Sequence, residues 1–153
     1  HTVRDWMSTP CIVVDGDTSV SHAMTLMRRR NIHSVVVEIG EQSPNYGIVT
    51  TTDIRDKIVA AGRDPANTRL REIMSGPIIT GRADWTLMEC SRVMHDNQFH
   101  HLPIADEQGT LIGLISATDI FVAVEEAGWI DGLEDLQETA PIEVFRGRRN
   151  HHG

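Results

Sequence analysis

Two stretches of the sequence place hydroxyl groups and a carboxylate at the same spacing. Thr50 stands three positions before Asp53, and Ser116 stands three positions before Asp119. In each stretch a glycine and two aliphatic residues come first, as at the end of a strand, and an apolar helical pattern follows. We therefore expect hydroxyls and an acid at two strand-to-helix junctions. The full stretches are Gly47-Ile48-Val49-Thr50-Thr51-Thr52-Asp53-Ile54 and Gly113-Leu114-Ile115-Ser116-Ala117-Thr118-Asp119-Ile120.

The chemistry of these groups is that of sugar and phosphate recognition. A carboxylate accepts two hydrogen bonds, so Asp53 or Asp119 could hold the two vicinal hydroxyls of a ribose. Exposed amides and the positive end of the following helix favour a nearby anion. The same spacing is also an ordinary helix N-cap, worth about 1 kcal/mol without any ligand. The two interpretations are compatible, because one side chain can cap the free helix and turn to a ligand when it arrives. The candidate hydroxyl groups are those of Thr50, Thr52, Ser116 and Thr118.

The two stretches belong to a longer internal repeat. Matching residues recur at an offset of 67, which becomes 66 between Asp53 and Asp119. Such self-similarity indicates a duplicated structural unit. We predict one repeat at residues 1–66, a second at 67–128 and a C-terminal extension at 129–153. The matching pairs include Met7 and Met74, Pro10 and Pro77, Met27 and Met94, and His33 and His100.

Each repeat is predicted to contain a strand, a helix, two strands and a second helix, which makes the fold α/β of the α+β type. Apolar spacing identifies the buried helix faces, and Gly62 is expected to end the last helix of the first repeat. Beyond the second repeat we expect a short amphipathic piece at 129–136 and a loosely held tail, with a docked strand at 142–145 as the alternative. The expected elements of the first repeat are strand 11–14, a helix burying Val20, Ala23, Met24 and Met27, strands 35–37 and 46–49, and helix 52–61. Those of the second are strand 78–79, a helix with Leu87, Cys90, Ser91 and Met94 on one face, strands 102–105 and 111–115, and helix 118–127.

The composition narrows the class of protein. Of the 153 residues 40% are hydrophobic and 24% are charged, which is ordinary for a soluble protein. The net charge of −8 argues against a nucleic-acid binder, which would present a basic face to phosphates. No apolar run approaches the roughly 18 residues of a membrane span, and no secretory signal is visible. We therefore expect a cytoplasmic protein without a membrane partner.

Neither the cysteines nor the terminal histidines predict a catalytic or metal site. Cys11 and Cys90 have no metal or redox spacing, and two thiols do not suggest a disulfide scaffold. Both lie in apolar patterns without a neighbouring base, so an enzyme that uses either thiol is the weakest hypothesis. His151-His152 lacks the converging ligands of a zinc site. We predict no required cofactor and no metal.

The ordered set of motifs, present twice, resembles a tandem pair of CBS (cystathionine-β-synthase) domains, the regulatory unit called a Bateman module. The resemblance covers about residues 3–128. It rests on Met-Ser-x-Pro at 7–10 and 74–77, on the helix with its methionines, and on both glycine-to-aspartate stretches. It implies a regulatory module, not an enzyme, that binds AMP, ADP or ATP, with NAD and S-adenosylmethionine as further candidates. The alternative is a purely structural assembly module whose clefts are empty.

The resemblance also implies an architecture and partners. The repeats of such modules pack through their sheets about a pseudo-twofold axis, which creates two clefts. Each cleft takes the hydroxyl and acid motif from one repeat and the first strand and first helix from the other. The implied partners are an adenine nucleotide, a second copy of the chain in a flat face-to-face homodimer, and an effector protein that the sequence does not identify.

Histidines stand where the family often places phosphate contacts. His33, His100 and His101 lie just before the central strand of each repeat, and Ser34 replaces the second histidine in the first copy. Imidazole donates to phosphate and gains charge near neutral pH. The alternative is an ordinary polar strand start. For the basic run at 28–30 we favour interaction with the helix dipole and solvent.

The residues before and within the first helix of each repeat distinguish the two predicted clefts. Thr18 and Ala23 match the small residues that the family often places near base and sugar, whereas the second repeat has Trp85 and Cys90 there. The cleft of Asp119 is therefore predicted to be complete, and the indole to fill the other cleft or to stack on a base. The predicted ligand-binding residues are Thr18, Ala23, His33, Thr50, Thr52, Asp53, His100, His101, Leu114, Ser116, Thr118 and Asp119.

Overall fold

The computed structural model describes residues 2–40, 45–127 and 146. The chain divides into two compact units, His1–Ile120 and Phe121–Gly153. Both copies of the hydroxyl and acid motif lie in the first unit. The expected segments 129–136 and 142–145, and the pair His151-His152, fall outside the described residues. The predicted repeat boundaries stay a prediction.

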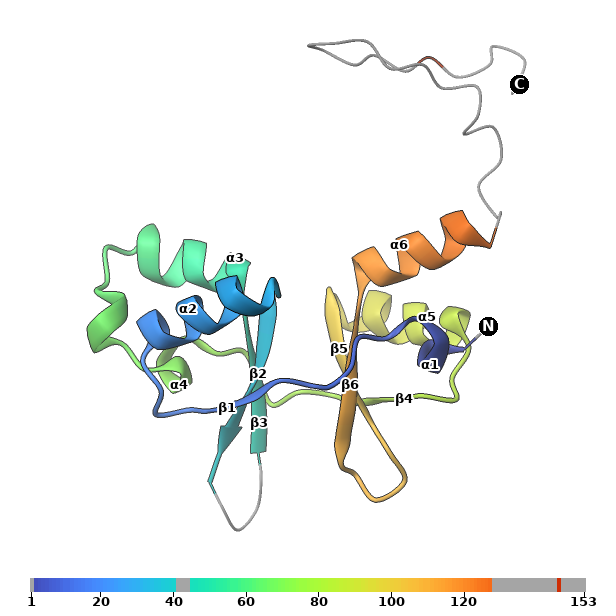
Figure 1. Ribbon diagram of the computed structural model, residues 1–153, viewed down its shortest axis with the longest axis horizontal. Coiled ribbons are helices and arrows are strands. Elements are labelled where there is room, and N and C mark those ends of the chain that lie inside the picture. The colour runs from blue at the N-terminus through green and yellow to red at the C-terminus, as the bar shows by residue number, and fades with distance from the viewer. Residues whose placement is uncertain (1, 41–44, 128–145, 147–153) are drawn as a thin grey trace. The chain divides into compact units, whose positions relative to one another are not determined.

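Each copy of the repeat folds as a strand, a helix, two strands and a helix, as the sequence predicts (Figure 1). The first part of the chain forms α1 (Val3–Trp6), β1 (Val13–Asp15), α2 (Val20–Arg30), β2 (Ser34–Ile39), β3 (Asn45–Thr50) and α3 (Thr51–Ile54), which continues as the π-helical turn η1 (Arg55–Val59). The 3₁₀ turn η2 (Pro65–Asn67), α4 (Leu70–Ile73), β4 (Gly81–Arg82), α5 (Leu87–Asn97), β5 (His101–Ala105), β6 (Leu111–Ser116) and α6 (Ala117–Glu126) follow.

Two three-stranded sheets carry the repeats, in the orders β1-β2-β3 and β4-β5-β6. In each sheet the first strand is parallel to the second, and the second is antiparallel to the third. Ser34 pairs with Thr50, and His101 pairs with Ser116. The register therefore places the start of each central strand beside the hydroxyl residue of its own repeat.

The segment before each first strand crosses to the other repeat. Ser8 N donates to Leu114 O at 2.8 Å, and Leu114 N donates back to Ser8 O at 3.0 Å. Ile48 N and Ser75 N make the equivalent reciprocal pair, at 2.8 and 2.9 Å. Each third strand thus holds a segment of the opposite repeat, and these exchanged segments join the two repeats.

Glycine is required where the exchanged segments cross. A Cβ atom at Gly113 would lie 2.9 Å from the carbonyl oxygen of Ser8, and one at Gly47 would lie 3.0 Å from that of Ser75. A side chain at either position would push the backbones apart. The glycine that opens each motif therefore allows the close approach of the two chains.

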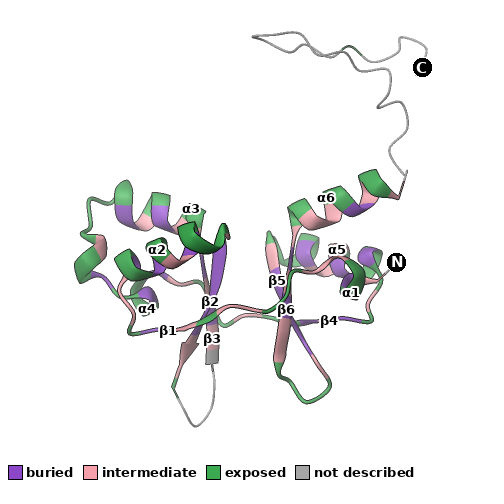
Figure 2. Cartoon of the chain, in the orientation of Figure 1, coloured by how far each residue is buried: buried purple, intermediate pink, exposed green. Residues whose placement is uncertain are grey.

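Helix caps and an apolar core fix the two longer helices of the first unit. Ser19 Oγ accepts from His22 N at 3.1 Å at the start of α2, and Thr86 Oγ1 accepts from Glu89 N at 3.1 Å at the start of α5. The faces that look toward the sheets are buried (Figure 2). The helical pattern predicts that Met24 is buried, but this residue is 38% exposed. The buried core of the first sheet contains Val20, Ala23, Met27, Val35, Val37, Val49, Ile54, Ile58, Leu70 and Ile73.

The predicted strand at 78–79 is wrong. The strand of that repeat is β4, which begins at Gly81. Ile78 N instead donates to Tyr46 O of the opposite repeat at 3.2 Å, and the side chain of Ile79 is 42% exposed. Ile78 and Ile79 belong to the crossing segment, and they line a cavity instead of pairing in a sheet.

Candidate functional site

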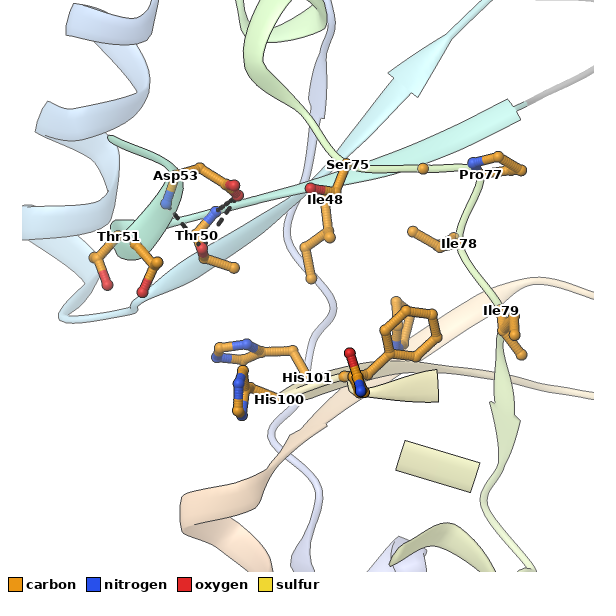
Figure 3. Close-up of a pocket in the computed structure, with 15 residues that line it drawn as sticks. Ile48, Thr50, Thr51, Asp53, Ser75, Pro77, Ile78, Ile79, His100 and His101 are labelled. Atoms are coloured by element: carbon orange, nitrogen blue, oxygen red, sulfur yellow. Dashed lines mark hydrogen bonds between the residues drawn. The ribbon is translucent and has the colours of Figure 1, made fainter. Parts of the chain in front are cut away.

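A cavity of about 350 Å³ lies beside the motif of the first repeat, and we call it the Asp53 cleft. Figure 3 shows Thr50 and Asp53 on one side of this cavity, with His100 and His101 across from them. Residues 75–79 of the crossing segment form a further wall. The cleft therefore combines a polar side from one repeat with an apolar wall from the other. The lining residues are Ile48, Thr50, Thr51, Thr52, Asp53, Ser75, Gly76, Pro77, Ile78, Ile79, Gln98, Phe99, His100, His101 and Pro103.

The motif of the second repeat lines a larger cavity of about 520 Å³, the Asp119 cleft. Its opposite wall comes from the crossing segment of the first repeat and from the residues after α2, in the same relation as in the Asp53 cleft. The predicted exchange of walls between the repeats is thus present in both cavities. The lining residues are Ser8, Pro10, Cys11, Ile12, Asn31, Ile32, His33, Ser34, Val36, His100, His101, Leu114, Ser116, Ala117, Thr118 and Asp119.

Both motifs form complete capping boxes. Asp53 Oδ2 accepts from Thr50 N at 2.8 Å and from Thr50 Oγ1 at 3.1 Å, while Asp53 N donates back to Thr50 Oγ1 at 3.2 Å. Ser116 and Asp119 make the same three bonds, at 2.8, 3.0 and 3.2 Å. The capping interpretation is confirmed for both copies. One carboxylate oxygen of each acid is used in this way, and the capping box leaves the other oxygen available for further contacts.

The two acids differ in the surroundings of that second oxygen. Lys57 Nζ lies 3.2 Å from Asp53 Oδ1 and also donates to the carbonyl oxygen of Ile73 at 2.8 Å. The counterpart of Lys57 at the offset of 66 is Ala123. Among the ion pairs of residues 2–40 and 45–127, none involves Asp119. The repeats are therefore unequal at the group predicted to hold a sugar.

The histidines are positioned by the same junctions. The carbonyl oxygen of His33 accepts from Thr51 N at 3.0 Å, and that of His100 accepts from Ala117 N at 2.9 Å. His100 and His101 line both clefts, whereas His33 lines the Asp119 cleft. Burial lowers the pKa of His101 below 6.5, and the charge of His100 adds to this shift. His101 is thus a neutral donor or acceptor at neutral pH.

Thr18 and Ala23, predicted to lie in the Asp119 cleft, line neither of the two cavities. Thr18 N bonds to Asp15 O, and the carbonyl oxygen of Thr18 accepts from Leu70 N at 2.9 Å, so this residue connects β1 to α4. Ala23 is fully buried in the core. Asn31, the C-cap residue that follows α2, lines the Asp119 cleft, whereas the start of α2 does not.

Trp85, which was predicted either to fill the Asp53 cleft or to stack on a base there, does not line that cavity. The carbonyl oxygen of Trp85 accepts from Val3 N at 2.9 Å, and Cys90 is fully buried. Neither residue lines a cleft. The other predicted site residues do line one: His33, Thr50, Thr52, Asp53, His100, His101, Leu114, Ser116, Thr118 and Asp119.

The apolar walls are the part of the clefts that the sequence analysis missed. Ile78, Ile79 and Phe99 line the Asp53 cleft, and Ile12 and Ile32 line the Asp119 cleft. The signal was available, because Ser-x-Pro-x-Ile recurs at 8–12 and 75–79. Its apolar residues look like strand formers when the sequence is taken alone.

The cysteines, the possible metal ligands and the lengths of the helices bear on other functional classes. Burial raises the pKa of both Cys11 and Cys90 to about 11, so neither is a thiolate near neutral pH. Among residues 2–40, 45–127 and 146, no group of three or more histidine, cysteine, aspartate or glutamate side chains could hold a metal ion. No helix in these ranges has the length and apolar character needed to span a bilayer.

Several known proteins are similar to this chain. Protein MK0525 of Methanopyrus kandleri is 38% identical over 94 residues, which are 61% of this chain and 47% of that protein. The CBS domain-containing protein YhcV of Bacillus subtilis is 31% identical over 121 residues, covering 79% of this chain and 84% of YhcV. The chain thus spans less than half of one relative and most of the other.

Solved structures share the fold. The hexameric CBS-CP12 protein from bloom-forming cyanobacteria superposes with a TM-score of 0.77 at 28% identity, covering 88% of this chain and 79% of that one. CBSX2 in complex with AMP has a TM-score of 0.63 at 21% identity, over 83% of this chain and 98% of that one. The CBS domain pair of protein MJ0100, in complex with 5-methylthioadenosine and S-adenosyl-L-methionine, has a TM-score of 0.71 at 22% identity, over 83% and 98%.

The family assignment follows from the match of the CBS domain to both copies of the repeat. The matched residues are 3–60 and 70–126, and each range contains one glycine-to-aspartate motif, one capping box and one three-stranded sheet. The chain belongs to the CBS domain family, as a tandem pair of CBS domains.

Proposed function

We propose that this CBS pair is a regulatory module that binds an adenosine-containing nucleotide of the AMP, ADP and ATP class between its repeats. One observation carries the proposal. In each of two repeat-related cavities, an acid and a hydroxyl from one repeat face an apolar wall from the other, with histidines alongside. These are the groups that a ribose, a base and a phosphate require.

Each part of a nucleotide has a matching surface. A free carboxylate oxygen accepts ribose hydroxyls. Ile12 and Ile32 in the Asp119 cleft, and Ile78 and Phe99 in the Asp53 cleft, offer apolar contact to a base. Histidine donors suit the phosphate. The volumes lie within the range of about 300–1,000 Å³ that is typical of small-molecule sites.

Proteins of the same fold supply support at the level of the fold. CBSX2 was solved with AMP, and the pair from MJ0100 with two adenosine-containing compounds. Their identity to this chain is low, so they do not distinguish AMP from the other candidates. We expect the regulated effector to be a protein, and we expect a homodimer, which sedimentation can test.

The Asp119 cleft is proposed as the better site, although for other reasons than the sequence suggested. It is the larger cavity, it contains His33 in addition to His100 and His101, and Asp119 carries no lysine partner. Thr18 and Ala23 do not contribute to this ranking of the Asp119 cleft above the Asp53 cleft.

The test measures thermal stability and binding heat with AMP, ADP, ATP, NAD and S-adenosylmethionine. A ligand at 100 times its Kd should add about 2.7 kcal/mol to the free energy of unfolding. No stabilisation by any of the five would favour the structural assembly module with empty clefts. Asp119→Ala should weaken AMP binding more than Asp53→Ala, and calorimetry giving the reverse would show that the order of the clefts is wrong.

A further inference from the structure

Lys57 makes the Asp53 cleft chemically different from its counterpart. Its ammonium group lies between Asp53 Oδ1, at 3.2 Å, and the carbonyl oxygen of Ile73, at 2.8 Å. Lys57 does not itself line the cavity, whereas Asp53 does. The lysine therefore acts on the cleft through the carboxylate that it contacts.

The number of free acceptor positions follows from the hydrogen bonds. A carboxylate offers about four lone-pair positions, two on each oxygen. Thr50 occupies both positions on Asp53 Oδ2, and Lys57 occupies one on Oδ1. One position is left on Asp53. In the Asp119 cleft, Ser116 occupies both positions on Oδ2 in the same way. No hydrogen bond or ion pair among residues 2–40, 45–127 and 146 uses Oδ1 of Asp119, so two positions remain there. Two vicinal hydroxyls of a ribose need two acceptors, so Asp119 can serve both and Asp53 can serve one.

Lys57 is not easily displaced by a ligand. Its bond to Ile73 O satisfies a backbone carbonyl at the end of α4, and the side chain of Ile73 is 1% exposed in the core. Ile73 also precedes the crossing segment, whose residues from Ser75 onward form the wall of the Asp53 cleft. Moving the ammonium group would remove the hydrogen-bond donor of this carbonyl, which costs free energy.

We propose that Lys57 is a specificity-determining residue that makes the Asp53 cleft a weak ribose site with little preference for an intact cis-diol. The Asp119 cleft, which lacks this cation, is the tight site that requires both hydroxyls. This inference rests on the proposed function, because it assumes that the acids receive a ribose. It adds that one chain has two unequal sites, and it names the side chain responsible.

The experiment follows each cleft separately by isoleucine methyl NMR in the full chain. Ile78 and Ile79 line the Asp53 cleft, whereas Ile12 lines the Asp119 cleft. AMP and 2′-deoxy-AMP are titrated into wild type, Lys57→Met and Lys57→Arg. Methionine keeps most of the length of the side chain but cannot donate a hydrogen bond, and arginine keeps the cation as the matched control. Lys57 is 42% exposed, so both variants should fold, and wild type alone already tests the cis-diol preference.

In wild type, removing the 2′-hydroxyl should weaken binding about tenfold or more at Ile12, and only about twofold at Ile78 and Ile79. Lys57→Met should tighten AMP binding in the Asp53 cleft, followed at Ile78 and Ile79, about tenfold. In this variant 2′-deoxy-AMP should bind more weakly than AMP in the Asp53 cleft, and binding followed at Ile12 should not change. Lys57→Arg should behave as wild type.

Three results would overturn the inference. The first is an equal loss of affinity on removal of the 2′-hydroxyl in both clefts of wild type. The second is an AMP affinity at Ile78 and Ile79 that is the same in Lys57→Met as in wild type. Both leave nucleotide binding itself intact. The third is the absence of any methyl shift with AMP in wild type and variants, which would remove the proposed function as well.

Discussion

Replacing Gly113 with alanine should separate the exchanged segments of the Asp119 cleft. The new Cβ would lie 2.8 Å from Met7 Sδ and 2.9 Å from Ser8 O. The thioether can move, but the carbonyl belongs to the backbone and holds Leu114 N at 3.0 Å. Relief of the clash therefore lengthens the two hydrogen bonds between Ser8 and Leu114.

The magnitude follows from these contacts. Overpacking costs about 1–3 kcal/mol, and each of the two weakened hydrogen bonds adds up to about 1 kcal/mol, so the free energy of unfolding should fall by about 1–5 kcal/mol. Ser8 lines the Asp119 cleft, so AMP should also bind more weakly there. The Asp53 cleft has its own crossing segment and should keep its affinity.

Urea unfolding and methyl NMR with AMP measure these two effects. Gly109→Ala is the matched control, because Gly109 has φ +84° and a Cβ there meets nothing within 4 Å. It should cost about 1–2 kcal/mol through backbone strain and leave both clefts unchanged. The reasoning is refuted if Gly113→Ala is as stable as wild type, or if its Ile12 methyl titrates with AMP as in wild type.

Two further predictions concern titratable groups. Because burial lowers the pKa of His101 below 6.5, the unfolded chain takes up the proton more readily. The free energy of unfolding should therefore decline as pH falls below 6.5, and urea unfolding should show less decline in His101→Gln; an identical pH profile would contradict this. Because the pKa of Cys11 is about 11, iodoacetamide should modify it slowly near neutral pH and about tenfold faster for each pH unit of increase. AMP should slow this reaction, since Cys11 lines the Asp119 cleft, and mass spectrometry showing rapid labelling at neutral pH would be evidence against the buried thiol.

Much of the fold was predictable because it is local and repeated. The glycine-to-aspartate motifs are capping boxes, which are built from residues three positions apart. The buried face of α5 follows the apolar spacing of Leu87, Cys90 and Met94. The antiparallel pairing of the second and third strands follows from the few residues between them, whereas the first strand pairs with the second in parallel across a helix. Comparison of the two copies supplied what a single copy could not, namely which elements belong together.

The errors have a common physical origin in the exchange of segments between repeats. The apolar residues at 78–79 look like a strand, but they cross to the other repeat and line a cavity. Thr18 and Ala23, before and within the first helix, were predicted to line a cleft from the family resemblance, yet the residue at this helix that lines the Asp119 cleft is its C-cap, Asn31. A linear pattern indicates that a residue is buried or polar, but it does not say which distant element covers it.

The sequence by itself determined the duplication, the order of the elements and the position of each acid at a helix start, because these depend on residues close together in the chain. Only the tertiary structure decided which walls face those acids. It also decided how many acceptor positions of each acid are free. Lys57 lies one helical turn after Asp53, but its ammonium group also donates to the carbonyl oxygen of Ile73, which belongs to another element. The inequality of the two clefts therefore arises from packing between elements far apart in the sequence.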